Sequence, residues 1–525
     1  MVVVEFDYEE FKDIFKEPKE KVIEVLNKIG APAEVDPETG KIFVEITPNR
    51  PDWYSVVGLA RGVRAFERNE TKKYKVKKGD YKVFVDKKTK KIRPYTACAV
   101  VKGLKLTDRE IRDIVLLQEK LLFTLGRVVK RFGIGVYPLE KLNFPLYYTT
   151  MKPDEIIFHP LNYPTEANAK EILERHPKGQ SYGGIIVKEK EYPVYLDANK
   201  KIMALIPIIN SEETGKIDIT TTGVFIEVTG VDKVSINQAL NIIVCHLVDL
   251  GGEAYTVDVE YSDKKMTTPL LDYKEVKVNT KKVKKVLGID IDTNEIKKAL
   301  NKMGYYVDGE KILAQPYRVD IISDIDVIED IAIAHGYENF EPTIPDFFYP
   351  GKKNNKKLEI DGCMSRMGFT EVITPILTND DELSEFETIG MKVLNPKTKE
   401  YTTVRSTMFP SMLEVIEKNK MAGLPQMFYE VGIVVDGEKE KNILCLAVVD
   451  KKVEFEKARG YLQVFFKERG WKFELKNKKY SFFEEPYSMD VFVDGKKIGR
   501  GGKLSKSIRE RHKLNTEIFM YEIEV

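Results

Sequence analysis

Residues 317–340 read YRVDIISDIDVIEDIAIAHGYENF, an apolar, isoleucine-rich run interrupted by Asp and Glu side chains. A segment this apolar is normally buried, and a buried carboxylate costs free energy unless a cation or hydrogen-bond donors meet it. The alternating stretch PYRVDI, residues 316–321, predicts a short strand that ends near Asp320 or Ile322. Ser323, with Asp326 three residues later, has the spacing of a capping box, so a helix is predicted to begin there.

Three of the acidic residues are predicted to share one face of this helix. Asp326, Glu329 and Asp330 stand at positions i, i+3 and i+4, and Asp320 can approach the first helical turn from the end of the strand. Oxygen ligands that converge in this way suit a hard cation such as Mg²⁺. The alternative is a capped acidic helix without metal, because the helix dipole favours acidic residues in the first turn and Arg318 can pair with one of them. Spacing alone leaves both interpretations open.

The composition of the chain limits the class of protein. At 525 residues the chain is too long to fold around a single hydrophobic core, so three or four domains are expected. The net charge is +1, so any contact with nucleic acid must come from local patches. Four distant cysteines without a CxxC pair argue against a thiolate zinc site and a secreted disulfide framework. Without a recognisable signal peptide or an apolar run long enough to span a bilayer, a soluble cytoplasmic protein with no membrane partner is expected.

The pattern along the chain predicts an α+β multidomain protein. Residues 1–93 are expected to form an N-terminal α/β domain that ends in a lysine-rich hairpin and linker (residues 71–93). Residues 94–265 mix strands and helices around two loops rich in proline and small polar residues. Residues 266–345 contain two short basic helices separated by a glycine turn, like a helix-turn-helix, and end in the acidic helix. Residues 352–525 follow an α+β order, with antiparallel strands around an Asp-Gly turn.

A basic face is predicted on the helix that begins near Pro51. Arg61, Arg64 and Arg68 lie on one side of it. One interpretation is a solvated basic face. The other is a contact with a phosphate or with an acidic partner subunit.

Long stretches of the sequence resemble the beta subunit of phenylalanyl-tRNA synthetase, in its archaeal and eukaryotic form. The stretch QPYRVDIISDIDVIEDIAIAHGYENFEP (315–342) resembles that subunit's signature, as does EITPNRPDWYSVVGLARGVRAF (45–66). Stretches similar to its editing domain are GLKLTDREIRDIVLLQEKLLFTLGR (103–127), EILERHPKGQSYGG (171–184) and IPIINSEETGKIDITTTGVFIEVTG (206–230). Stretches similar to its degenerate class II synthetase domain, which has an antiparallel sheet, are RMGFTEVITPILTND (366–380) and VLNPKTKEYTTVRSTMFPSMLEVIEKNK (393–420).

The resemblance implies a magnesium site on the acidic helix. The family pattern D-x5-D-x2-E-D falls on Asp320, Asp326, Glu329 and Asp330, the residues that spacing brings together. Asp324 lies outside the pattern and is expected to face solvent.

The resemblance also implies partners and an activity. Members are α2β2 tetramers in which the alpha subunit binds ATP and phenylalanine and attaches the amino acid to tRNA(Phe). This chain is then expected to have no catalytic residue for aminoacylation. Arg405 stands in a context similar to the ATP-binding arginine of class II enzymes, and a structural role is expected for it.

Editing of mischarged Tyr-tRNA(Phe) is the expected activity of residues 94–265. An apolar pocket rejects an added hydroxyl by only about a hundredfold, so a separate hydrolytic site has a purpose. Asn210 is the candidate editing residue. Ala204 stands where the family usually has a serine, and Ile206 replaces a proline, so retention of editing is left open.

Two alternatives of other classes remain. One is a free-standing editing or accessory paralogue, which copurification with an alpha subunit would exclude. The other is a helix-turn-helix regulator that uses residues 280–304. The second helix of that segment offers mostly lysines, which contact phosphate but read no base sequence.

Overall fold

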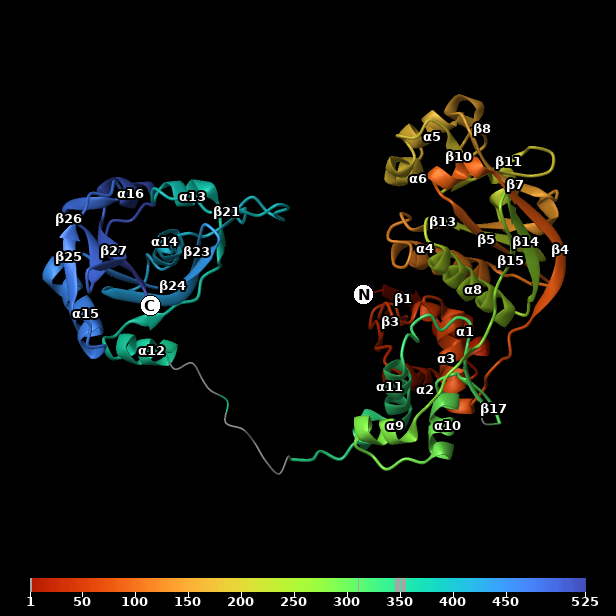
Figure 1. Cartoon of the computed structure of the whole chain (residues 1–525), viewed down its shortest axis with the longest axis horizontal. Coiled ribbons are helices and arrows are strands. Elements are labelled where there is room, and N and C mark those ends of the chain that lie inside the picture. The colour runs from red at the N-terminus through yellow and green to blue at the C-terminus, as the bar shows by residue number, and fades with distance from the viewer. Residues whose placement is uncertain (1, 310, 345–350, 352–355) are drawn as a thin grey trace. The chain divides into compact units, whose positions relative to one another are not determined.

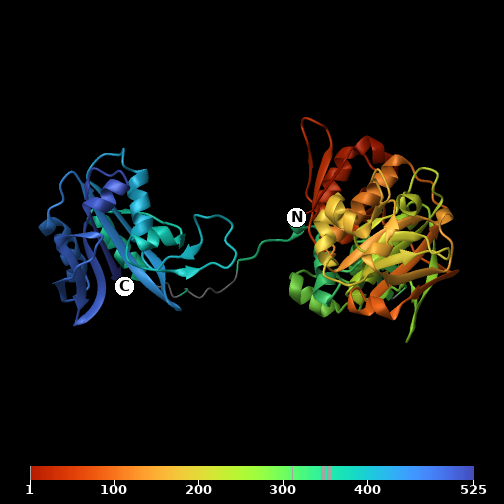
Figure 2. The same ribbon diagram turned by 90° about the horizontal axis from the view of Figure 1, so that it is seen from above.

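The computed structural model describes residues 2–309, 311–344, 351 and 356–525. The chain divides into two compact units, residues 1–344 and 345–525, which Figures 1 and 2 show from two directions. Both units combine helices with sheets, so the predicted mixed α+β multidomain class is confirmed. Every cysteine is a buried free thiol, as predicted.

The N-terminal part of the first unit is a small sheet with helices on it. Its elements are β1 (Val2–Phe6), α1 (Tyr8–Phe15), α2 (Lys19–Lys28), β2 (Ala33–Val35), β3 (Ile42–Ile46) and α3 (Val56–Arg68), with strand order β1-β3-β2. The alternating apolar residues of β1 and β3 are buried, and α1 and α2 contact α3.

A ten-stranded sheet forms the centre of the first unit. Its strands are β4 (Val76–Val85), β5 (Tyr95–Lys102), β6 (Phe132–Pro138), β7 (Leu146–Met151), β10 (Tyr192–Leu196), β11 (Ile202–Leu205), β12 (Ile209–Asn210), β13 (Gly223–Gly230), β14 (Glu253–Tyr261) and β15 (Lys265–Thr268). They run in the order β12-β11-β10-β7-β4-β14-β5-β13-β6, and β15 pairs with β14. The long helix α8 (Lys233–Asp249) lies along β5 and β13 (Figure 1). Further helices are α4 (Asp108–Phe123), α5 (Ala169–Arg175), α6 (Pro177–Tyr182) and α7 (Glu212–Gly215).

The prediction that residues 71–93 form a lysine-rich hairpin and linker is wrong, because β4 lies within the central sheet. It runs parallel to both β14 and β7. Val83 and Val85 are buried while most of the lysines between Val76 and Lys82 stay exposed. The lysine-rich residues 71–93 therefore include a strand of the central sheet with exposed lysines and a short 3₁₀ helix, Lys87–Lys91, after it.

The acidic helix α11 (Asp324–His335) begins where the sequence predicts. Ser323 accepts a hydrogen bond at the N-cap, and Asp326 completes the capping box. The helix packs against α10 (Thr293–Lys302), which follows α9 (Thr280–Leu287), and both contact it. Small strands complete this part: β16 (Lys274–Glu275), β17 (Tyr306–Asp308) and β18 (Lys311–Ala314).

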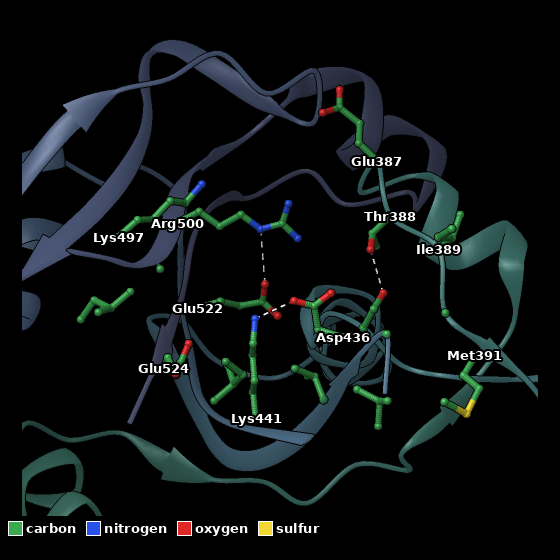
Figure 3. A pocket seen from close by; sticks show the side chains of 18 of the residues that line it. Glu387, Thr388, Ile389, Met391, Asp436, Lys441, Lys497, Arg500, Glu522 and Glu524 are labelled. Atoms are coloured by element: carbon green, nitrogen blue, oxygen red, sulfur yellow. Dashed lines mark hydrogen bonds and ion pairs between the residues drawn. The ribbon is translucent and has the colours of Figure 1, made fainter. Parts of the chain in front are cut away.

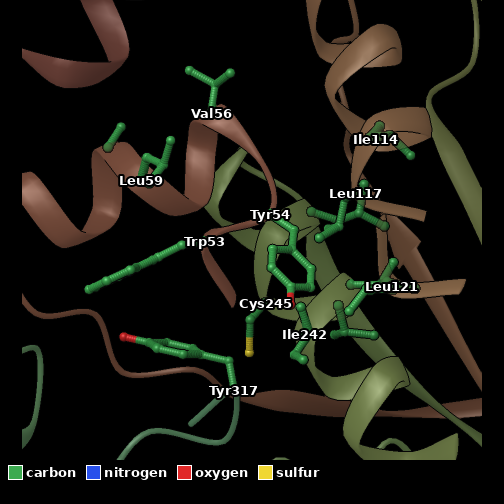
Figure 4. Close-up of a cluster of buried hydrophobic side chains, with 14 of the residues drawn as sticks. Trp53, Tyr54, Val56, Leu59, Ile114, Leu117, Leu121, Ile242, Cys245 and Tyr317 are labelled. Carbon is green, nitrogen blue, oxygen red and sulfur yellow. The ribbon is translucent and has the colours of Figure 1, made fainter. Parts of the chain in front are cut away.

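The predicted strand over residues 316–321 is wrong. β18 ends at Ala314, and a turn at Pro316 and Tyr317 is followed by irregular backbone up to Ser323. The apolar alternation of this segment reflects burial of single side chains. Tyr317, for example, inserts into the core formed by the opening segment, near Trp53 and Cys245 (Figure 4). Tyr317 and the contact of α10 with α3 thus pack this part of the chain against the opening segment.

The predicted basic face of α3 is also wrong, because its arginines are paired within the chain. Arg61 is 7% exposed, donates to Asp249 at the end of α8 at 2.7 Å, and stacks on the ring of Tyr317. Arg64 and Arg68 pair with Glu70 and Glu17. This side of α3 is buried at Arg61, half-buried at Arg64 and exposed at Arg68.

The second unit is built on a seven-stranded sheet. The strand order is β19-β23-β24-β28-β27-β26-β25, in which β19 (Thr370–Glu371), β23 (Gln426–Asp436), β24 (Lys439–Asp450), β25 (Phe473–Asn477), β26 (Phe483–Val493), β27 (Lys496–Leu504) and β28 (Glu517–Glu524) take part. The predicted Asp-Gly turn joins β23 to β24. A smaller sheet holds β20 (Leu377–Thr378), β21 (Met391–Lys392) and β22 (Thr403–Val404), and the helices are α12 (Lys356–Arg366), α13 (Asp380–Ser384), α14 (Phe409–Lys418), α15 (Phe455–Glu468) and α16 (Lys506–Arg511).

Candidate functional site

An acidic cavity lies between α11 and the segment that follows β3. Its volume is about 360 Å³. All four predicted metal ligands line it: Asp320, Asp326, Glu329 and Asp330. Thr47, Asn49 and Arg50 line the opposite side. The spacing of the carboxylates along the sequence therefore does bring them to one place.

Arg318 neutralises two of these carboxylates. Its guanidinium is buried and donates to both oxygens of Asp320 and, at 2.6 Å, to Asp330. The hydroxyl of Tyr305 donates to the same oxygen of Asp330 at 2.7 Å. Asp320 and Asp330 thus have partners within the protein. The alternative without metal predicted that Arg318 pairs with one of the carboxylates, and in the structure it pairs with two.

The other two carboxylates differ. Asp326 accepts from the backbone N–H groups of Ile322 and Ser323 through one oxygen, and these bonds hold its pKa below the usual range in spite of partial burial. Glu329 is exposed on the cavity wall. Asp324, by contrast, points away and pairs with Lys282 on the surface, as predicted.

The four carboxylates of this cavity do not together form a coordination site for Mg²⁺. Within residues 2–309, 311–344, 351 and 356–525, no three His, Cys, Asp or Glu side chains are grouped closely enough to hold a metal ion. A site with four carboxylate ligands is therefore not assembled. Mg²⁺ commonly binds through one or two carboxylates and keeps its waters, a mode that Asp326 and Glu329 allow without breaking the Arg318 pairs.

A second cavity of the first unit lies beside the ten-stranded sheet. Its volume is about 440 Å³. Most of its wall is apolar, from the loop Leu205–Ile209, β6 and α4. Its polar lining residues include Asn210, His176 and, on β13, Glu227 and Thr229, and further polar residues line it from α4, α6 and Asn162. An apolar cavity with a few convergent polar groups is the usual form of a small-molecule site.

Glu227 is the chemically unusual residue of this cavity, and the sequence analysis missed it. It is 1% exposed. Oε1 accepts from the hydroxyl of Tyr137 at 3.3 Å, whereas Oε2 has no hydrogen-bond partner among the residues that the structure describes. Burial raises the pKa of Glu227 to about 8, although Arg93 and Tyr137 act to lower it. A buried carboxylate with one oxygen that lacks a hydrogen-bond partner is a candidate for binding a ligand.

Two glycines make room for Glu227. Gly135 on β6 is its register partner, and a Cβ there would lie 2.6 Å from Oε1 of Glu227. Gly133 faces Thr229 in the same way, and a Cβ there would lie 2.8 Å from Pro207 on the other side of the cavity. A side chain at either position would therefore displace a neighbour in or beside the cavity.

The two predicted editing residues are placed differently. Asn210 lines the cavity, and its Oδ1 accepts from the same Tyr137 hydroxyl at 3.1 Å. Ala204 pairs with Asn210 between β11 and β12, but its side chain is fully buried in the core with Tyr195 and Met203. A serine at position 204 would place its hydroxyl behind Asn210. Ile206 lines the cavity itself.

A larger cavity, of about 1080 Å³, lies in the second unit (Figure 3). Charged side chains of both signs line it and are paired: Asp436 with Lys441 at 2.6 Å, and Glu522 with Arg500 at 3.5 Å. The hydroxyls of Thr388 and Ser406 bond to each other. The charges of this cavity are largely engaged with one another.

Arg405 lies in the interior of the second unit. It is 1% exposed and donates to Thr374, to Glu430 at 3.0 Å and to the carbonyl of Ile433. These bonds tie β22 and the segment after β19 to β23. A structural role for Arg405 stays a prediction, with which these contacts agree.

Among the residues that the structure describes, no helix is both long and apolar enough to cross a membrane.

Comparison with known proteins identifies the class first. Residues 276–337, which contain α9, α10 and α11, match the family model of the tRNA synthetase B5 domain. Residues 346–525 match the model of the phenylalanyl tRNA synthetase beta chain CLM domain. The chain is thus related to tRNA synthetases in both of its units.

Full-length relatives make this more specific. The phenylalanine–tRNA ligase beta subunit of Archaeoglobus fulgidus is 34% identical, over 100% of this chain and 98% of its own. That of Thermococcus sibiricus is 32% identical, over 100% and 96%. An N-terminal fragment of the phenylalanyl-tRNA synthetase beta subunit from Pyrococcus horikoshii superposes with a TM-score of 0.60 at 33% identity, covering 63% of this chain and 99% of the fragment. The chain belongs to the family of phenylalanine–tRNA ligase beta subunits, as its sequence motifs predicted.

Proposed function

We propose that this chain works in the cytoplasm as the beta subunit of an α2β2 phenylalanine–tRNA ligase. An alpha subunit then binds ATP and phenylalanine and charges tRNA(Phe). The likeness to beta subunits along the whole chain supports this assignment. The internal engagement of Arg405 supports a second unit of the degenerate class II type, with the aminoacylation site in the partner.

We further propose that the cavity around Glu227 hydrolyses Tyr-tRNA(Phe), within an editing domain at residues 94–265. The single observation that carries this proposal is the unpaired buried oxygen of Glu227 in a largely apolar cavity. The cavity is the right class of site for an aromatic side chain, and the ionised form of Glu227, whose share grows as pH rises through its pKa of about 8, can accept a hydrogen bond from a phenol hydroxyl. Phenylalanine would leave that ionised form unpaired, and a buried unpaired charge is costly.

The reaction is hydrolysis of an ester. Water adds its oxygen to the tyrosyl carbonyl carbon, the bond to the terminal ribose oxygen breaks, and that ribose oxygen takes a proton, which releases tyrosine and tRNA. The chain's own groups orient the substrate. Glu227 holds the phenol, while Asn210 lies at the same cavity and can bind polar groups of the aminoacyl ester. Ala204 stands where the serine is expected and offers no hydroxyl to Asn210, whose side chain bonds to Tyr137.

We propose that Mg²⁺ binds at the acidic cavity of the helix-turn-helix-like domain, residues 266–345. The predicted set is Asp320, Asp326, Glu329 and Asp330, and all four line the cavity. Asp326 and Glu329 would hold the ion directly, with water completing its shell, while Asp320 and Asp330 remain paired with Arg318. The bound cation would supply positive charge next to the packed opening segment.

Coexpression with the alpha subunit tests the assignment. The complex should purify together, charge tRNA(Phe) with phenylalanine and, in a separate assay, hydrolyse preformed Tyr-tRNA(Phe). A chain that remains alone and hydrolyses Tyr-tRNA(Phe) would instead be a free-standing editing protein. If the complex charges tRNA(Phe) but does not hydrolyse Tyr-tRNA(Phe), the beta-subunit assignment stands and the editing proposal fails.

A further inference from the structure

Arg93 lies directly behind the cavity proposed for editing. It stands in the irregular segment before β5 and is 1% exposed. Its guanidinium donates to the carbonyl of Thr229 at 2.9 Å and to that of Val129 at 3.4 Å. Both of those residues line the cavity, one on β13 and one just before β6. Arg93 therefore ties together the two chain segments that form the back wall.

Arg93 and Glu227 carry complementary unpaired atoms. Within the described part of the chain, Nε of Arg93 is a buried donor without a partner, and Oε2 of Glu227 is a buried acceptor without one. Buried groups of this kind are rare in folded proteins and point to a missing water or ligand. Glu227 and Thr229 are two residues apart on β13, so the Thr229 carbonyl that Arg93 contacts is close to Glu227 along the strand.

The other groups that influence Glu227 are neutral. They come from each strand packed around it: Cys98 on β5, Tyr137 on β6, Tyr148 on β7 and Tyr195 on β10. Burial raises the pKa of each of these side chains, so they stay protonated near neutral pH. Burial lowers the pKa of Arg93, but a guanidinium remains charged. Among these groups, Arg93 alone brings a full charge to Glu227.

We propose that Arg93 is a positioning residue of the editing site: its buried guanidinium holds the back wall of the cavity and favours the ionised form of Glu227, which can accept a hydrogen bond from tyrosine. This inference rests on the proposed editing function. It adds a distinct physical role, because Arg93 touches neither the cavity nor the substrate. Selection of tyrosine over phenylalanine then depends on a charge placed behind the wall.

The test is the pH profile of Tyr-tRNA(Phe) hydrolysis by the complex with the alpha subunit, from about pH 6 to about pH 10, after subtraction of the reaction without enzyme. The wild-type rate should rise through a midpoint near 8, the pKa of Glu227. In Arg93→Gln the midpoint should move upward by about one pH unit or more, which makes hydrolysis about tenfold slower near pH 7 and restores most of it near pH 10. In Glu227→Gln the dependence on pH should disappear.

The variant Arg93→Lys distinguishes the effect of the positive charge at position 93 from that of the hydrogen bonds to the two wall carbonyls. It keeps the positive charge but cannot bond two carbonyls with a planar fork, so its midpoint should stay near that of the wild type while the maximal rate falls. Thermal unfolding of each complex reports whether the fold is intact. Should Arg93→Gln fail to fold, Arg93→Lys still decides, because a midpoint shifted by a unit or more would contradict the role of the charge.

The outcomes distinguish this inference from the function on which it rests. An equal loss at every pH in Arg93→Gln, with an unchanged midpoint, would overturn the inference and leave a merely structural arginine. If Glu227→Gln retains the wild-type profile, the assignment of Glu227 itself is wrong. If the wild-type complex hydrolyses no Tyr-tRNA(Phe), the editing function fails and the inference fails with it.

Discussion

The acidic cavity beside α11 and the cavity around Glu227 contain buried carboxylates that are treated in opposite ways. At α11, Arg318 donates to both Asp320 and Asp330, and Tyr305 adds a further bond. At β13, Glu227 keeps one oxygen without a partner among the described residues, and burial raises its pKa to about 8. Paired carboxylates stabilise a fold locally, whereas an unpaired buried carboxylate costs stability and is retained where a ligand can use it.

Removing the pairing cation should have the largest effect. Arg318→Met would leave Asp320 and Asp330 buried without their shared partner, so we expect a loss of about 3–5 kcal/mol in the free energy of unfolding. Denaturant unfolding of the complex measures it. The matched control is Lys282→Met, which removes the exposed partner of Asp324 and should change stability little. A loss no larger than that of the control would contradict the view that Arg318 is the main partner of these carboxylates.

Metal binding should have the next largest effect. Mg²⁺ that binds the folded state at about a hundred times its Kd raises stability by about 2.7 kcal/mol. Glu329→Gln should abolish this increase, whereas Asp324→Asn, outside the cavity, should keep it. The measurement is thermal unfolding of the complex with and without Mg²⁺. Equal protection by Mg²⁺ in wild type and Glu329→Gln would mean that the acidic helix is only capped and paired.

Substitution of Asn210, in the cavity around Glu227, should have a smaller effect. Asn210→Ala removes one neutral hydrogen-bonding group from the cavity wall, worth about 1 kcal/mol, so Tyr-tRNA(Phe) hydrolysis should fall about fivefold while phenylalanine charging is unchanged. Asn199→Ala, outside this cavity, is a suitable control because its side chain is exposed and only its backbone N–H bonds to Asp197. An unchanged rate would remove Asn210 from the site.

A paired arrangement that pH alone can break lies in the second unit. His512 lies between Glu385, at 2.7 Å, and Glu417, at 2.5 Å. Burial lowers the pKa of His512, but the two carboxylates outweigh it and the pKa is raised above the usual 6.5. The stabilisation is therefore fully present below about pH 6.5 and is lost as pH rises through the folded pKa.

We expect this contribution to be about 1 kcal/mol, because the site is partly exposed. His512→Gln should remove the difference in unfolding free energy between about pH 6 and about pH 9 that the wild type has. If the variant and the wild type lose stability in parallel over this range, the histidine is not protonated between its two carboxylates.

Local spacing made one of the two cavities predictable. Ser323 and Asp326 form a capping box, and the positions of Glu329 and Asp330 follow from the geometry of one helix. Arg318 stands in the same stretch of sequence, so its pairing with a nearby carboxylate could also be predicted. The error lay in the preceding residues, where alternation suggested a strand although Tyr317 and Arg318 are buried as individual side chains with partners elsewhere.

The Glu227 cavity depends on tertiary contacts and was only half predicted. Asn210 was found through a resemblance, but Glu227 lies within GVFIEVTG, a strand buried along its whole length. Two signals were present: a lone carboxylate in an apolar strand, and glycines at alternate positions in FGIGVYP. Only the register of β6 with β13 shows that they face each other. β4 was missed for a similar reason, since its partner β14 begins at Glu253.

Glu227→Gln, tested in the complex with the alpha subunit, most directly decides whether the unpaired carboxylate is an editing group. Hydrolysis of Tyr-tRNA(Phe) and charging with phenylalanine are measured on the same preparation. Loss of a hydrogen bond to a charged group predicts hydrolysis slower by about tenfold to a hundredfold, with charging unchanged. Hydrolysis at the wild-type rate, in a complex that still charges tRNA(Phe), would contradict the account.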